Sequence, residues 1–166
     1  IGADLIGDVA IGGDPIGPAG RQFMIPTRFA YAAPSSLDDT VELLARDPAG
    51  SCLLGGGTWV VPDLNGGVVR PRQVIDLRHA GLGEIRVEGE SVLVGSMATY
   101  GQLVASSAVT EHAPLLALMA AGITGGAQIT GQGTVGGSAV AARPQSDIPA
   151  TLVALRAHAI LDGAEG

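Results

Sequence analysis

Lysine is absent from this sequence, and all nine of its basic residues are arginines. A phosphate-binding loop of the GxxxxGK[ST] type needs its lysine, so that class of nucleotide site is excluded. Aromatic residues are also scarce, at 3% of 166 residues, although hydrophobic residues make up 46%. A folded core must therefore be built mainly from alanine, valine, leucine and isoleucine.

Cysteine occurs only once, as Cys52. A single cysteine excludes an internal disulfide framework and is typical of a protein in a reducing cytoplasm. The three histidines, His79, His112 and His158, are scattered and form no metal-ligand spacing with Cys52. We therefore expect no metal site in this chain and interpret each histidine as a surface or packing residue.

Positive charge is in deficit, because the net charge is −7 and no basic stripe runs along the sequence. Nucleic acid is therefore not an expected partner. No apolar run approaches the roughly 18 residues that a membrane-spanning helix needs, so no membrane span is expected.

Glycine is in excess, at 26 residues, which is about twice its usual share of roughly 7%. Between the glycine clusters, hydrophobic patterning predicts short strands and helices. Strands are expected at 51–54, 71–77, 85–87, 91–94 and 158–161. Helices are expected after Ser36, after the capping box Thr99–Gln102, from Pro114 and after an N-cap at Asp147. A hairpin, further strands and several helices together indicate an α+β fold.

The first glycine cluster, loop one, has the sequence LLGGGTWV and spans residues 53–60, directly after an expected strand. Three consecutive glycines allow successive backbone N–H groups to point at one anion without interference from a Cβ atom. A tight turn is the simpler interpretation, but one glycine would suffice for it. We therefore favour binding of a diphosphate at this loop.

The second cluster, loop two, has the sequence GQGTVGG and spans residues 131–137. It contains a GxGxxG pattern, which suggests a Rossmann dinucleotide site. The surroundings contradict that interpretation. Residues 125–130 do not form a buried parallel strand, Pro144 arrives before a full crossover helix, and no acidic residue follows about 20 residues after Gly131.

Asp147 has two interpretations of equal weight. As an N-cap it has a complete structural explanation, because its carboxylate can accept a hydrogen bond from the first turn of a helix. It could equally accept a hydrogen bond from a hydroxyl group of a bound ligand.

Taken together, four stretches resemble a known family, the FAD-binding medium subunits or domains of molybdenum hydroxylases such as xanthine dehydrogenase and carbon monoxide dehydrogenase. They are LLGGGTWVVPDL (53–64), RPRQVIDLRH (70–79), VLVGSMATYGQL (92–103) and AQITGQGTVGGSAVAARPQSDIPATLVAL (127–155). The last is the most specific, since it is similar to the family's TIGGN and P-x-S-D signature. The chain departs from that signature at Ser138, where the family usually has asparagine, and at Thr130–Gln132.

The resemblance implies the two-lobed FAD-binding fold of the vanillyl-alcohol-oxidase type, with FAD extended between the lobes. Residues 1–22 would form an extended or disordered arm, residues 23–62 a small N-terminal lobe, and residues 63–166 a second α+β lobe. That second lobe is expected to be truncated at its C-terminal end, because family members continue well beyond this point.

The resemblance also implies an electron-transfer subunit of an oxidoreductase. FAD would relay electrons from iron–sulfur clusters to an acceptor, with the molybdenum cofactor on a large partner subunit and [2Fe-2S] clusters on a small one. This chain would contribute no catalytic residue of its own. The residues expected at the FAD are Leu53, Leu54, Gly55, Gly56, Gly57, Thr58, Trp59, Val60, Thr124, Thr134, Val135, Gly136, Gly137, Ser138 and Asp147. Among them, Gly56 and Gly57 in loop one and Gly136 and Gly137 in loop two would present backbone N–H groups to the diphosphate, and the hydroxyl at Asp147 would be a ribityl one.

Two alternatives remain. One is a scaffold or binding subunit of the same fold that does not bind FAD, which the departure at Ser138 makes conceivable. The other is a dinucleotide-dependent Rossmann enzyme, against which the surroundings of loop two argue.

Overall fold

The computed structural model describes residues 25–163, so the expected arm at 1–22 lies outside the described residues. The chain divides into two compact units, the first extending to Ala80 and the second running from Gly81 to Asp162. The sequence analysis places the lobe boundary between residues 62 and 63 instead. The difference arises because residues 63–80 include the central strand of the first unit's sheet.

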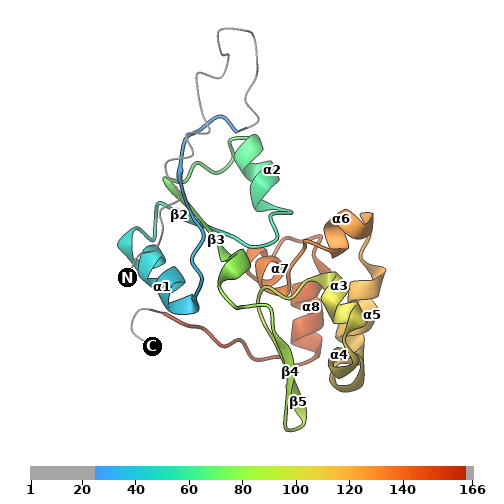
Figure 1. Cartoon of the computed structure of the whole chain (residues 1–166). Coiled ribbons are helices and arrows are strands. Elements are labelled where there is room, and N and C mark those ends of the chain that lie inside the picture. The colour runs from blue at the N-terminus through green and yellow to red at the C-terminus, as the bar shows by residue number, and fades with distance from the viewer. Residues whose placement is uncertain (1–24, 164–166) are drawn as a thin grey trace. The chain divides into compact units, whose positions relative to one another are not determined.

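The first unit is a small parallel sheet with two helices. Its elements are β1 (Ala30–Ala32), α1 (Leu37–Arg46), β2 (Ser51–Leu54), α2 (Val60–Asn65), β3 (Gln73–Asp76) and the 3₁₀ helix η1 (Leu77–His79). The strand order is β1-β3-β2, and both pairings are parallel (Figure 1). The sheet places the carboxyl ends of β2 and β3 at one edge, where loop one begins.

The start of α1 agrees with the expected N-cap. The Ser36 side chain accepts a hydrogen bond from the backbone N–H of Asp39, and Asp38 and Asp39 lie in the first turn. Strand β1 was not anticipated. It has three residues, too few for an alternating pattern to be visible in the sequence.

The second unit is a hairpin followed by short helices. The hairpin pairs β4 (Ile85–Glu88) with β5 (Ser91–Val94) in antiparallel register, as the sequence predicts. The helices are α3 (Tyr100–Ala105), α4 (Ser107–His112), α5 (Pro114–Gly122), α6 (Gly126–Thr130), α7 (Val135–Ala141) and α8 (Asp147–Ala154). The expected capping box at Thr99–Gln102 and the expected helix start at Pro114 are both present.

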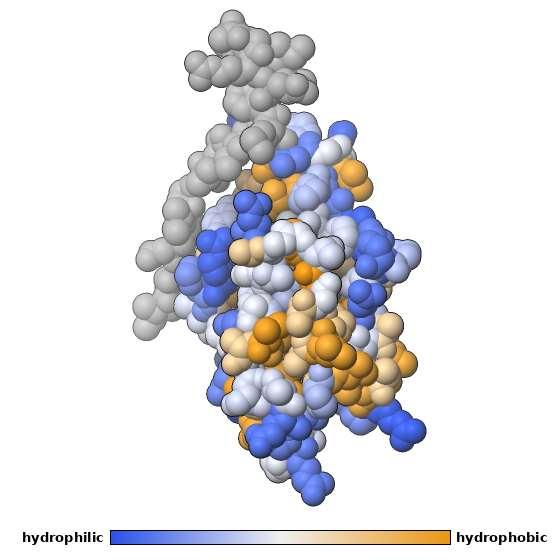
Figure 2. All heavy atoms as spheres, turned by 90° about the vertical axis from the view of Figure 1, so that its right-hand side faces the viewer, coloured by the Kyte–Doolittle hydropathy of each residue, from blue (hydrophilic) through white to orange (hydrophobic). Residues whose placement is uncertain are grey.

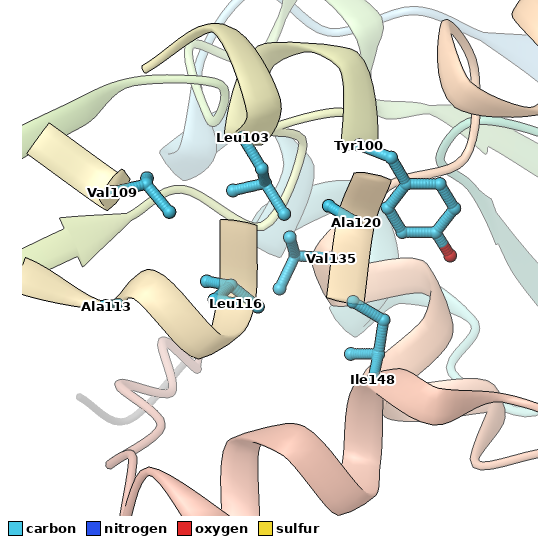
Figure 3. Packing of buried hydrophobic residues seen from close by; sticks show 8 residues of the cluster. All are labelled: Tyr100, Leu103, Val109, Ala113, Leu116, Ala120, Val135 and Ile148. Carbon is cyan, nitrogen blue, oxygen red and sulfur yellow. The ribbon is translucent and has the colours of Figure 1, made fainter. Parts of the chain in front are cut away.

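A buried apolar cluster holds these helices together. Its members come from α3, α4, α5, α7 and α8 and from the residue between α4 and α5 (Figure 3), and they are Tyr100, Leu103, Val109, Ala113, Leu116, Ala120, Val135 and Ile148. Small and branched side chains dominate the cluster, as the scarcity of aromatic residues requires. Apolar side chains also gather on the surface (Figure 2), where Val104, Leu115 and Leu118 of α3 and α5 are exposed.

Two expectations about the second unit are wrong. Residues 158–161 form no strand and are exposed, because no strand in the described part of the chain pairs with them. A short apolar run alone does not distinguish a strand from an irregular segment. Asp147 is not the N-cap of α8 either: Ser146 occupies that position and makes no side-chain capping bond, while Asp147 is the first helical residue.

The glycine-rich stretch between α5 and residue 137 contains α6 and the start of α7. Helix α7 ends at Ala142, whose φ of 43° is left-handed, two residues before Pro144. Across the residues that the structure describes, no helix is both long and apolar enough to cross a membrane.

The capping box at the start of α3 generates a stability prediction. The Thr99 hydroxyl accepts a hydrogen bond from the backbone N–H of Gln102, and the Gln102 side chain accepts one from the backbone N–H of Thr99. Thr99→Ala removes one of these bonds, so we expect the free energy of unfolding to fall by about 1 kcal/mol in urea titrations. Ser107→Ala, at the exposed first residue of α4, is the control and should change it little. Equal effects of the two substitutions would contradict the capping role.

Candidate functional site: two glycine loops

Loop one follows β2 and leads into α2, at the carboxyl edge of the parallel sheet. Gly57 has a φ of +75°, a left-handed conformation that favours glycine, and its carbonyl accepts the hydrogen bond from Val61 that begins α2. Within the described residues, the backbone N–H groups of Gly55, Gly56, Gly57 and Thr58 donate no hydrogen bond. Consecutive open donors of this kind can bind an anion.

The same edge of the sheet carries a polar cluster that the sequence analysis missed. Asp76, the last residue of β3, is almost fully buried and accepts hydrogen bonds from the Tyr31 hydroxyl at 2.7 Å and the Arg78 backbone N–H at 2.9 Å. The Arg78 guanidinium forms a 3.2 Å ion pair with the same carboxylate. The sequence did contain an indication of this cluster, since an aspartate directly after the strand sequence QVI is unusual at a buried position. The cluster fixes the turn that closes β3.

Two side chains of the first unit, Tyr31 and Cys52, have raised pKa values. Burial, and next the hydrogen bond to Asp76, raise the pKa of Tyr31 above its ordinary value. Burial, and next the charge of Asp63, raise the pKa of the Cys52 thiol. Both side chains therefore remain protonated at neutral pH. Neither supplies a thiolate or phenolate nucleophile beside loop one.

Loop two lies between α6 and α7 and has a different internal structure. Its backbone N–H groups are already engaged: Val135 donates to the Ala98 carbonyl at 3.0 Å, Gly136 to the Ser96 carbonyl at 2.8 Å, and Gly137 to the Thr134 hydroxyl at 3.3 Å. The expectation that Gly136 and Gly137 direct free N–H groups at a diphosphate therefore differs from the observed bonding. Open donors are found in loop one instead.

The glycines of loop two allow close approach to the segment 96–100. A Cβ atom on Gly136 would lie 2.8 Å from the Ser96 carbonyl oxygen, and one on Gly133 would lie 3.0 Å from Cδ2 of Tyr100. Real Cβ atoms essentially never come as close as the first distance. The GxGxxG spacing is thus explained by packing inside this unit, which agrees with the rejection of a Rossmann site.

Thr134 and Ser138 are buried rather than presented to solvent. Thr134 is the N-cap of α7 and accepts the hydrogen bond from Gly137. The Ser138 hydroxyl forms a hydrogen bond with the Tyr100 hydroxyl. Their side chains therefore act inside the protein, and any contact they make with a ligand would have to come from the backbone or from the shape of the loop.

The remaining expected site residues divide between the two units. Leu53, Leu54, Trp59 and Val60 belong to the first unit, where they flank the open amides of loop one. Thr124 and Asp147 belong to the second unit and are both exposed. Helix α8, which begins at Asp147, packs against α7. Loop two, α7 and Asp147 are thus parts of one packed arrangement.

Comparison with known proteins identifies the family of this chain. Residues 27–166 match the family described as the FAD binding domain in molybdopterin dehydrogenase. The carbon monoxide dehydrogenase medium chain of Hydrogenophaga pseudoflava is 37% identical over 144 residues, which cover 86% of this chain and 50% of that protein. The 6-hydroxypseudooxynicotine dehydrogenase complex subunit alpha of Paenarthrobacter nicotinovorans is 31% identical over the same share of this chain and 48% of its own length.

Solved structures agree with these sequence matches. Carbon monoxide dehydrogenase from Hydrogenophaga pseudoflava superposes with a TM-score of 0.73 at 36% identity, covering 76% of this chain and 44% of that one. The chain spans about half the length of the curated relatives it matches. The family match, the identities and the shared α+β fold lead to one conclusion: this chain belongs to the family of FAD-binding domains of molybdopterin dehydrogenases.

Proposed function

We propose that the chain binds FAD in the medium subunit of a molybdenum-containing hydroxylase or dehydrogenase, where it relays electrons from iron–sulfur clusters to an acceptor. The observation that carries the proposal is the run of open N–H donors from Gly55 to Thr58 in a member of an FAD-binding family. FAD supplies the redox chemistry when bound, and the protein supplies binding and orientation.

Loop one offers backbone N–H groups to a diphosphate, and the composition of the chain explains why backbone groups are used. The chain has no lysine, and loop one contains no arginine, so the loop's own side chains offer no positive charge. Backbone dipoles are the device that remains, and they act only when the backbone comes within about 3 Å of a phosphate oxygen. Residues without a Cβ atom on the ligand side allow that approach, which accounts for the glycines at positions 55–57.

Loop two is proposed to contribute shape rather than diphosphate donors. Its backbone is held by segment 96–100, so it offers a rigid surface that includes the exposed Gly137. A preformed surface lowers the entropy that binding must overcome. Asp147, exposed at the start of α8, is proposed to accept a hydrogen bond from a ribityl hydroxyl of the flavin.

The same fold without bound FAD is the alternative, and the engaged N–H groups of Gly136 and Gly137 favour it. Flavin absorbance of the purified protein separates the two functions. Relatives are named as a medium chain and as a subunit of a complex. By analogy, we propose a molybdenum-binding large subunit and a [2Fe-2S] small subunit as partners in the cytoplasm, which mass spectrometry of the native complex would identify.

Gly56 provides the sharpest test of loop one. Its φ is not in the left-handed region, unlike that of Gly57, so a side chain at this position is compatible with the backbone. Gly56→Val should therefore give a folded protein that retains little flavin, because its side chain blocks the approach to the phosphate oxygens. The measurement is the ratio of flavin to protein absorbance at equal helical content.

Gly122→Val is the matched control, since a Cβ at Gly122 meets nothing within 4 Å and that residue ends α5 in the other unit. It should retain wild-type flavin content. If Gly56→Val also keeps full occupancy, loop one does not hold the diphosphate. A wild-type chain without flavin absorbance, even after incubation with FAD, would favour the alternative function.

Asp147→Ala separates a binding role from a structural one. Because Asp147 makes no capping bond, its loss should lower stability only by the helix-dipole contribution of about 0.3–1 kcal/mol. Loss of a hydrogen bond from a ribityl hydroxyl to its carboxylate should weaken flavin binding by roughly 1.5–3 kcal/mol. Ser146→Ala is the control, and titration of FAD by fluorescence quenching gives both affinities. If Asp147→Ala leaves the affinity for FAD unchanged, the residue has only a structural role at the start of α8.

A further inference from the structure

Tyr100 contacts loop two and its continuation into α7 through three different groups. Its backbone N–H donates to the Gly133 carbonyl at 3.1 Å. Its ring lies against Gly133, where a Cβ atom would be 3.0 Å from Cδ2. Its hydroxyl is hydrogen-bonded to the hydroxyl of Ser138, 38 residues later in the chain. One residue therefore contacts the segment 133–138 at both of its ends.

These contacts are shielded from water. Tyr100 is 6% exposed and Ser138 is 2% exposed. Figure 3 shows the Tyr100 ring at the margin of the apolar cluster, with its hydroxyl directed away from the other labelled side chains. Since neither hydroxyl has ready access to water, removing one leaves the other buried without its partner, which is costly.

The segment between these two contacts is the part of loop two with the least freedom. Gly136 approaches Ser96 so closely that its N–H donates to the Ser96 carbonyl, and Val135 donates to Ala98 in the same way. Both acceptors lie on the segment that ends at Tyr100. A shift of α7 away from Tyr100 would therefore lengthen these bonds and change the surface of the loop.

We propose that Tyr100 is a positioning residue for the flavin site: through Gly133 and Ser138 it holds residues 133–138 in the shape that FAD contacts. The inference rests on the proposed function. In this chain a short side chain at position 138 leaves room for the Tyr100 hydroxyl, so the two residues act as a pair.

The test uses the 166-residue chain in four variants: Tyr100→Phe, Ser138→Ala, the double variant, and Val109→Ala as control. Tyr100→Phe keeps the ring and its packing and removes only the hydroxyl. Val109 is fully buried on α4, so its truncation lowers stability without removing any hydrogen bond of loop two. Two quantities are measured below all melting temperatures: hydrogen exchange of the Gly136 amide and the dissociation constant for FAD.

We expect each single hydroxyl variant to speed Gly136 exchange and to weaken FAD binding about tenfold, the effect of one buried unpaired hydroxyl. The double variant should weaken binding by much less than the product of the single effects, because neither hydroxyl is then left alone. Val109→Ala should change neither quantity at loop two, although it melts earlier.

Unchanged Gly136 exchange in both single variants would overturn the positioning role, whatever the flavin data show. Faster exchange with unchanged FAD affinity would also overturn it, because the order that Tyr100 gives to loop two would then not affect FAD binding. Independent, multiplicative effects in the double variant would show that the two residues do not act as a pair. A wild-type chain that binds no FAD overturns the proposed function itself, a result distinct from these three.

Discussion

The second unit depends on a short backbone ladder between residues 96–100 and 133–136. Tyr100 donates to Gly133, Val135 to Ala98 and Gly136 to Ser96, and an isolated bridge pairs Thr99 with Thr134. Both threonines are also N-caps, of α3 and α7 respectively. The ladder thus starts two helices side by side, and the apolar cluster closes behind them. The bonds of this ladder are made by the main chain. The ladder therefore limits the space for a Cβ atom at these positions more than it limits the chemical type of the side chain.

Glycine consequently plays two different physical roles in this chain. In loop two, glycine permits two backbone segments to come within hydrogen-bonding distance, and the N–H groups are used up inside the protein. In loop one, glycine leaves consecutive N–H groups without a hydrogen-bond partner among residues 25–163, at the carboxyl edge of a parallel sheet. Only the second arrangement leaves donors for an anionic ligand, which is why the diphosphate proposal rests on loop one.

Much of the local structure follows from short-range signals. Ser36, the capping box at Thr99–Gln102 and the alternation around the 85–94 hairpin each depend on neighbours within a few residues, and each prediction is confirmed. The expected strand at 158–161 is wrong because strand formation requires a partner, which an apolar run does not reveal. The family and its α+β fold were accessible from four sequence stretches and are confirmed by the comparisons.

The site was less accessible from sequence than the fold. The glycine clusters indicated close backbone approach in both loops, but not whether the approaching group would be a ligand or another part of the chain. That distinction depends on Ser96 and Tyr100, which lie more than 30 positions before loop two, and no sequence pattern shows that the loop contacts them. The polar cluster around Asp76 was missed for the same reason, since its partner Tyr31 is 45 residues away.

The most direct test is a titration of the ¹⁵N-labelled chain with FAD, followed through the backbone amide resonances of both loops. The account predicts large changes at Gly55, Gly56, Gly57 and Thr58, whose N–H groups gain an acceptor. The Gly136 amide should keep its internal hydrogen bond and its slow exchange. Large changes at Gly136 and Gly137 with none in loop one would contradict the account, because the diphosphate would then lie on the loop whose donors are already engaged.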